Sequence, residues 1–209
     1  MNLVNKPAPR FSAPAVIDGE EIINDFSLDQ YIGKKNVILF FYPKDFTFVC
    51  PTEILAFQEK LSVFAEKDTV VVGCSTDTEE THLAWLLTPK NKGGIEGVTF
   101  PMVADTAKTI ATNYGVLGGD YTYDDNGNLV FEGAPICLRG TYLINKEGII
   151  KHVSINDFPL GRNIDEYIRL VDALRYVEKH GEVCPANWEE GKEAMHETRE
   201  SVANYLGKQ

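Results

Sequence analysis

The sequence is poor in cysteine, in basic residues and in long hydrophobic runs. Its longest apolar run, residues 37–42, has the length of a strand, whereas a membrane-spanning helix needs about 20 residues. The 31 acidic side chains outnumber the 20 basic ones and give a net charge of -11, which repels nucleic acids and anionic membrane surfaces. We therefore expect neither nucleic acid nor membrane as a partner. Four cysteines are too few for a small disulfide scaffold, so any importance they have should lie in their reactivity. They are Cys50, Cys74, Cys137 and Cys184.

The composition predicts a soluble globular protein. Apolar residues make up 44% of the chain, which is enough for a substantial core and excludes disordered and low-complexity architectures. Residues 1–9 show no charged segment followed by an apolar run of signal-peptide length. We therefore expect no secretion or transit signal and a cytoplasmic location, where thiols stay reduced.

Apolar periodicity predicts alternating strands and helices in the first half of the chain. Residues 37–42 are uniformly apolar and stop at Pro43, as in a strand buried on both faces. Apolar side chains then recur at helical spacing between residues 54 and 64, after Pro51, which places Cys50 at or beside a helix start. A second buried strand is expected at residues 70–72, followed by a helix that opens at 78–80. The apolar side of that helix is predicted to carry Leu83, Leu86 and Leu87.

The second half predicts two hairpins and a long helix. A short helix is expected from about residue 105 to Tyr114, ended by Gly115. Turn sequences at 124–127 and 145–148 each separate two strand-like segments. An amphipathic helix follows at 164–177. These elements predict an α/β domain with a mixed central sheet flanked by helices, over residues 1–180, and a C-terminal tail, helical in part, over 181–209.

Cys50 is the strongest candidate for chemistry. A sulfur just ahead of Pro51 lies where free backbone N–H groups and the positive end of the helix dipole converge, and this favours the reactive thiolate. A lone cysteine is otherwise most often a small buried apolar residue. The position of Cys50 between a buried strand and a helix start favours the interpretation as a nucleophile.

The residues near Cys50 give weaker signals. Thr47 could direct its hydroxyl at the sulfur and Pro43 fixes the loop, although a loop threonine is commonly only a turn or cap residue. Glu53 could equally complete a helix cap. No arginine is close to Cys50 in sequence, so any arginine beside the sulfur must be brought there by the folding of the chain. Each such arginine could instead form an ion pair on the protein surface. The candidates are Arg139 and Arg162.

Two segments resemble the peroxiredoxins of the typical two-cysteine class. Residues 43–53, PKDFTFVCPTE, match the PxxxTxxC loop of that family, and residues 181–188, GEVCPANW, resemble the segment around its resolving cysteine. Similar segments at 82–85, 138–141 and 156–162 extend the resemblance from about residue 3 to 206. It implies a thioredoxin-like fold and reduction of hydrogen peroxide and small alkyl hydroperoxides by cysteine alone, with no metal, haem or flavin cofactor.

The resemblance also implies a role for each candidate. Cys50 is the peroxidatic thiolate that attacks the peroxide and becomes a sulfenic acid. Thr47 hydrogen-bonds the peroxide, Arg139 stabilises the thiolate and the displaced charge, and Pro43 shields the sulfenate from water. The residues expected to orient this network are Glu53 and Arg162.

Cys184 is the implied resolving cysteine, which forms a disulfide with Cys50 of the partner in a head-to-tail homodimer. Members of the family often assemble further into a decamer. The implied reductant of the disulfide is a thioredoxin-type protein or a dedicated flavoprotein disulfide reductase. Residues 93–97 and 205–206 are altered forms of the GGLG and YF motifs of members that over-oxidise readily, so we expect intermediate sensitivity to over-oxidation.

Other interpretations compete with a peroxidase. A thioredoxin-like disulfide oxidoreductase would place a second cysteine where this chain has Glu53. A peroxide-sensing or chaperone role of the oligomer is the third possibility, and a chaperone or scaffold role would survive loss of both cysteines. We expect Cys74 and Cys137 to be packed thiols, with an accessory redox role open for Cys137. The histidines show no zinc-binding spacing, and the glycine-rich segment shows no nucleotide-binding pattern.

Overall fold

The computed structural model describes residues 2–208, which form two compact units that divide between Ile164 and Asp165. The functional division between residues 180 and 181 remains a prediction.

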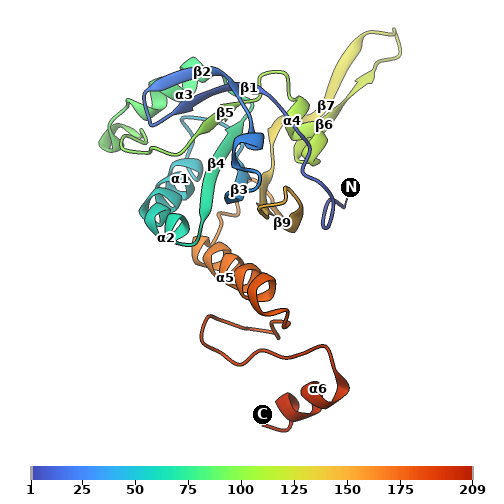
Figure 1. The fold of residues 1–209 in the computed structure, drawn as a ribbon. Helices are drawn as coiled ribbons and strands as arrows, with labels where there is room; N and C mark the ends of the chain where they lie inside the picture. The colour runs from blue at the N-terminus through green and yellow to red at the C-terminus, as the bar shows by residue number, and fades with distance from the viewer. Residues whose placement is uncertain (1, 209) are drawn as a thin grey trace. The chain divides into compact units, whose positions relative to one another are not determined.

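The first unit is built on a seven-stranded sheet with the strand order β2-β1-β5-β4-β3-β8-β9 (Figure 1). The central strands β3, β4 and β5 are parallel to one another, and antiparallel pairs extend the sheet on both sides. This is the predicted mixed central sheet. Its strands are β1 (Ala13–Ile17), β2 (Glu21–Phe26), β3 (Asn36–Phe41), β4 (Thr69–Ser75), β5 (Met102–Ala104), β8 (Arg139–Ile144) and β9 (Ile150–Asn156).

Helices cover both faces of the sheet because side chains of β3 alternate between two apolar faces. On one face, Phe40 stacks on Phe57 of α1 with ring centroids 4.4 Å apart. On the other face, Phe41 lies 5.3 Å from Tyr114 of α4. Every residue of β3 is buried, as the apolar run predicted. The helices of this unit are α1 (Cys50–Glu59), α2 (Leu61–Glu66), α3 (Glu79–Leu86) and α4 (Thr109–Tyr114), with short 3-10 turns η1 (Leu28–Tyr31) and η2 (Lys90–Lys92).

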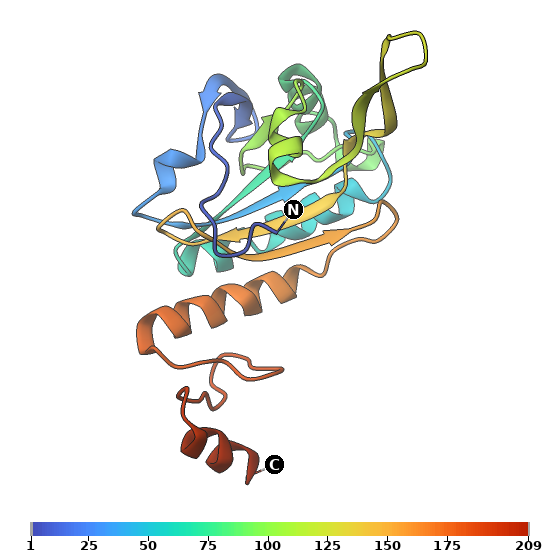
Figure 2. The ribbon, with the colours of Figure 1, turned by 90° about the vertical axis from the view of Figure 1, so that its right-hand side faces the viewer.

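Both predicted hairpins are confirmed. The strands β6 (Leu117–Tyr123) and β7 (Leu129–Cys137) form a separate two-stranded sheet that extends from the unit as an arm (Figure 2). Their turn is closed by the carboxylate of Asp124, which accepts the backbone N–H groups of Asn126 and Asn128. The second hairpin joins β8 to β9.

The predicted start of the short helix before Gly115 is wrong by about one turn. That helix, α4, begins at Thr109 because Asp105 caps it from outside: its carboxylate accepts the N–H groups of Ile110 at 3.1 Å and Ala111 at 2.7 Å. Gly115 ends the helix in the left-handed conformation, as predicted. The helical stretch after Cys50 is likewise interrupted, at Lys60, between α1 and α2.

The predicted apolar side of α3 is also wrong in part. Its buried residues are His82, Trp85 and Leu86, whereas Leu87 is 60% exposed. The pattern misleads because a histidine occupies a core position that sequence periodicity assigns to an apolar residue.

The long helix α5 (Ile164–His180) lies in the second unit from its second residue onward and confirms the predicted amphipathic helix. The short helix α6 (Arg199–Leu206) belongs to the same unit. Between them, Val183 and Met195 form an isolated antiparallel bridge with both backbone hydrogen bonds. No helix within residues 2–208 has the length and apolar character to cross a membrane.

Candidate active site

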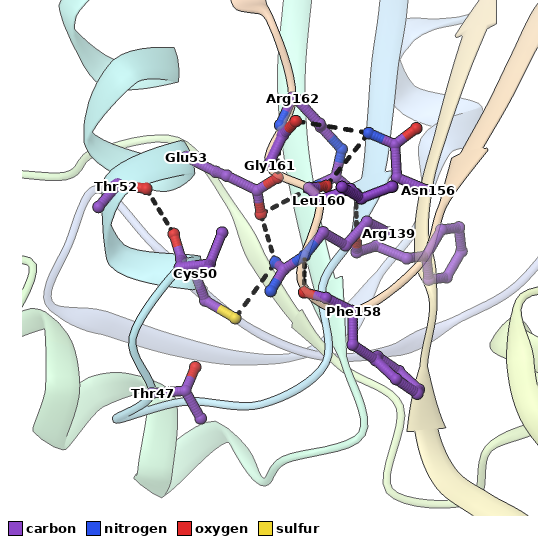
Figure 3. Close-up of polar contacts among 12 residues, drawn as sticks. Thr47, Cys50, Thr52, Glu53, Arg139, Asn156, Phe158, Leu160, Gly161 and Arg162 are labelled. Atoms are coloured by element: carbon purple, nitrogen blue, oxygen red, sulfur yellow. Dashed lines mark hydrogen bonds and ion pairs between the residues drawn. The ribbon is translucent and has the colours of Figure 1, made fainter.

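Cys50 is the first residue of α1 and follows the loop that leaves the buried strand β3 (Figure 3). The helix cap is Val49, whose carbonyl accepts hydrogen bonds from the backbone N–H and the hydroxyl of Thr52. Pro51 stands in the first turn, where its missing N–H costs no helical hydrogen bond. The prediction that Cys50 lies beside a helix start is therefore confirmed, and its residue is only 1% exposed.

Arg139 brings a positive charge to the sulfur. Its Nη1 lies 3.5 Å from Cys50 Sγ and 2.6 Å from Glu53 Oε2, and its Nε donates to the carbonyl of Phe158 at 2.7 Å. Arg139 is the first residue of β8, the strand that pairs with β3. The register of this antiparallel pair places Arg139 beside the C-terminal end of β3, where the loop to Cys50 begins. The alternative of an exposed ion pair is wrong, because Arg139 is 4% exposed.

Glu53 links the two arginines. Its Oε2 lies 2.6 Å from Arg139 Nη1 and 2.9 Å from Arg162 Nη1, and its Oε1 accepts the backbone N–H of Arg162 at 3.0 Å. Two buried guanidinium groups thus face one carboxylate. The remaining positive charge is the charge that a Cys50 thiolate would neutralise.

Arg162 is fixed by the sheet itself. Its Nε donates to the hydroxyl of Thr141 at 2.8 Å, and its Nη2 donates to the carbonyls of Gly140 and Phe41. Its side chain is fully buried, so an exposed ion pair is wrong here too. These contacts hold Glu53, and through it Arg139, in one orientation.

Thr47 and Pro43 lie on the loop between β3 and α1. The hydroxyl of Thr47 donates to the carbonyl of Lys44 at 2.8 Å, which leaves its oxygen lone pairs able to accept a hydrogen bond. No hydrogen bond joins Thr47 to Cys50 among the contacts of residues 2–208, although both side chains lie on the same side of the loop (Figure 3). Pro43 is buried at the start of the loop.

A buried ionic pair under this loop was not predicted from the sequence. His82 Nδ1 lies 2.7 Å from Asp45 Oδ2, His82 Nε2 lies 3.1 Å from the carbonyl of Val103, and Tyr42 donates to Asp45 Oδ1 at 2.8 Å. Both ring nitrogens therefore face oxygen atoms of other groups, the arrangement in which a doubly protonated histidine donates two hydrogen bonds. Burial lowers the pKa of His82, but the hydrogen bond and charge of Asp45 outweigh burial and raise it. The pair anchors the Thr47 loop to α3.

Cys184 belongs to the second unit and is half-buried. Its thiol lies 3.9 Å from the carbonyl of Ala173 on α5. It follows the bridge between Val183 and Met195, which closes the segment on itself.

The other two cysteines are core residues. Cys74 and Cys137 are fully buried in the cluster between the sheet and α4, and burial raises the pKa of each thiol. Neutral thiols packed in this way are poor nucleophiles, in agreement with the expectation that both are structural. All four cysteines are free thiols in this structure.

Comparison with known proteins places the whole chain among relatives. The AhpC/TSA family model matches residues 4–153, and the model described as the C-terminal domain of 1-Cys peroxiredoxin matches residues 173–208. Alkyl hydroperoxide reductase C of Helicobacter pylori is 52% identical over 98% of this chain and 96% of its own length. Peroxiredoxin-2 of Rattus norvegicus is 42% identical over 98% of this chain and 96% of its own.

Solved structures agree with these relatives. The reduced 2-Cys peroxiredoxin of Plasmodium vivax superposes with a TM-score of 0.88 at 42% identity, over 99% of this chain and all of the other. The Enterococcus faecalis AhpC structure gives a TM-score of 0.74 at 34% identity, over 88% of this chain and 100% of that one. The expected thioredoxin-like fold is thereby confirmed.

Proposed function

Because the chain belongs to the AhpC/TSA family of peroxiredoxins and is a peroxidase, we propose that it reduces hydrogen peroxide and small alkyl hydroperoxides with Cys50 as the nucleophile. The observation that carries the proposal is the guanidinium nitrogen of Arg139 at 3.5 Å from the buried sulfur of Cys50. A cation held at that distance stabilises the thiolate, which is the nucleophilic form of cysteine.

In the first step, the Cys50 thiolate attacks the terminal oxygen of the peroxide. A sulfur–oxygen bond forms, the oxygen–oxygen bond breaks, and the departing alkoxide or hydroxide takes up a proton to leave as alcohol or water. Arg139 faces the charge that moves onto the leaving oxygen. The hydroxyl of Thr47, whose own proton is donated to Lys44, accepts a hydrogen bond from the peroxide.

In the second step, Cys184 of the partner subunit attacks the sulfenic sulfur of Cys50. A disulfide forms, the sulfur–oxygen bond breaks, and the hydroxyl leaves as water with the proton of the Cys184 thiol. This step requires a homodimer, and assembly into a decamer is part of the proposal. The tail at residues 181–209 carries the resolving cysteine, and Pro43 shields the sulfenate before resolution.

The disulfide is then reduced by a thioredoxin-type donor or a dedicated flavoprotein disulfide reductase. Either donor reduces it by thiol exchange, which needs no metal, haem or flavin bound to this chain. A cytoplasmic location, where such donors are kept reduced, completes the proposal.

The test is peroxide consumption by wild type, Cys50→Ser and Cys184→Ser. We expect Cys50→Ser to lose activity with every reductant while circular dichroism shows an unchanged fold. Cys184→Ser should consume peroxide with dithiothreitol, which reduces the sulfenic acid directly, but not with a thioredoxin system. Activity that persists in Cys50→Ser would contradict the proposal and leave the chaperone alternative.

A further inference from the structure

We propose that Arg169 is a positioning residue for Cys184, holding the segment that carries the thiol and stabilising the thiolate that attacks in the resolving step. This inference rests on the proposed function of Cys184. All the contacts that carry it lie within the second unit, Asp165–Gln209.

Arg169 is itself held rigidly. Its Nε and Nη2 each lie 2.7 Å from a carboxylate oxygen of Glu166, one turn earlier on α5. This two-point contact orients the planar guanidinium and leaves Nη1 directed away from Glu166. Nη1 donates to the carbonyl of Trp188 at 3.1 Å.

The hydrogen bond from Arg169 to Trp188 fixes the C-terminal end of residues 184–188, the segment that begins with Cys184. The backbone N–H of Trp188 donates to Pro185 at 3.2 Å, so residues 185–188 form a closed turn directly after Cys184. The indole N–H of Trp188 donates to the carbonyl of Lys192 at 3.1 Å, and its ring packs 5.0 Å from that of Tyr176. Arg169 therefore ties this turn to α5.

Cys184 itself contacts the face of α5 that carries Arg169. The thiol lies 3.9 Å from the carbonyl of Ala173, which is four residues after Arg169 and so one turn along the same face of α5. The guanidinium and the thiol thus share a face of the helix. Burial raises the pKa of Cys184, the Arg169 cation opposes that rise, and the Glu182 carboxylate adds to it.

Glu182 supplies an opposing charge from the Cys184 segment. It accepts the hydroxyl of Tyr176 at 2.5 Å and lies 3.4 Å from Nε2 of His196. Removing the Arg169 cation should therefore raise the pKa of Cys184, and removing the Glu182 carboxylate should lower it. The ionisable groups around Cys184, Arg169 and Glu182 include Glu166, Tyr176 and His180 on α5, and Glu189, Lys192 and His196 on the segment that follows.

The experiment measures alkylation of Cys184 by iodoacetamide from pH 6 to 10 in the full chain carrying Cys50→Ser, with peptide mass mapping to identify the modified thiol. Arg169→Gln should slow the reaction about three- to tenfold at pH 7.5 and move the midpoint of the pH profile upward. Arg169→Lys should recover part of the loss. Glu182→Gln should speed the reaction and lower the midpoint.

Arg175→Gln is the matched control, because Arg175 is an exposed arginine on the same helix. An unchanged midpoint in Arg169→Gln would overturn the inference. So would alkylation that is faster at every pH, since that result means the segment has merely come loose.

A second readout follows resolution in chains that retain Cys50. After one equivalent of peroxide, Arg169→Gln should form the disulfide about three- to tenfold more slowly. A second equivalent, added before resolution is complete, should oxidise more of its sulfenic acid at Cys50 to sulfinic acid than in wild type. If wild type forms no disulfide with Cys184 while the alkylation profile shifts as expected, the proposed function fails and the electrostatic role of Arg169 stands. If wild type forms the disulfide and Arg169→Gln matches it in both readouts, only the inference fails.

Discussion

The two cysteines proposed to react are held in different ways. Cys50 is almost completely buried, and its cation belongs to a network anchored on two strands, β3 and β8, and the helix α1 of the first unit. Cys184 is half-buried, and the contacts described around it come from one helix and its own segment. The difference fits two chemical tasks: the first thiol must meet a small peroxide in a fixed arrangement, whereas the second must move to another sulfur. Substitutions at the residues around each thiol test that contrast.

The largest effect is expected from the cation at Cys50. Arg139→Met should lower kcat/KM for hydrogen peroxide by about 100- to 1,000-fold, because it removes a preorganised donor from the reacting atoms. Arg139→Lys should recover only part of this, since a lysine cannot reach the sulfur, Glu53 and Phe158 together. Stopped-flow measurement of peroxide reduction checks both variants. A loss below threefold in Arg139→Met would show that the network is structural only.

A smaller effect is expected at Thr47. Thr47→Val keeps the shape of the side chain but removes the acceptor for the peroxide hydroxyl, and should lower kcat/KM about 10- to 100-fold. Thr47→Ser keeps the hydroxyl and is the matched control. If valine and serine behave alike, the loop geometry matters and the hydroxyl does not.

The ionic pair under the Thr47 loop should affect stability with a definite pH dependence. The pKa of His82 is raised in the fold, so the stabilisation is fully present below the unfolded value of about 6.5 and is lost as pH rises through the folded value. His82→Gln should cost about 1 to 3 kcal/mol at pH 6, and the difference from wild type should shrink toward pH 9.

Urea unfolding across this pH range measures the effect. The matched control is His180→Gln, at the exposed end of α5. A difference between wild type and His82→Gln that stays constant with pH would show that His82 is not charged in the fold.

The smallest effect on activity is expected from the core thiols. Cys137→Ala should leave peroxide reduction within about twofold of wild type and lower stability by roughly 1 kcal/mol, because Cys137 acts as a small packed side chain. A loss of turnover with the thioredoxin system would instead assign Cys137 the accessory redox role that the sequence left open.

Strong local patterns predicted much of the fold. The strands β3 and β4 follow from unbroken apolar runs, and both hairpins follow from their turn residues. The strands β1, β2 and β5 were not predicted from the sequence. The last is only three residues long, and β1 begins next to Pro14, so neither has a periodicity long enough to detect.

The residues of the candidate site likewise differ in whether local sequence could identify them. Cys50 is identifiable from local sequence because strand, loop and helix start are adjacent in the chain. The arginines were candidates without a local signal, since Arg139 is 89 residues from Cys50 and reaches it only through the pairing of β3 with β8. The pair between Asp45 and His82 was missed because 37 residues separate its members. A histidine at a core position of a helix was the one available signal.

The central claim is that Cys50 is oxidised first and that Cys184 of the other subunit resolves it. The most direct measurement is non-reducing electrophoresis with peptide mass mapping after one equivalent of hydrogen peroxide, on wild type, Cys50→Ser and Cys184→Ser. The account predicts a covalent dimer joined through Cys50 and Cys184 in wild type alone, and a Cys184→Ser chain that gains oxygen at Cys50. A disulfide within one Cys184→Ser chain, from Cys50 to Cys74 or Cys137, would contradict it.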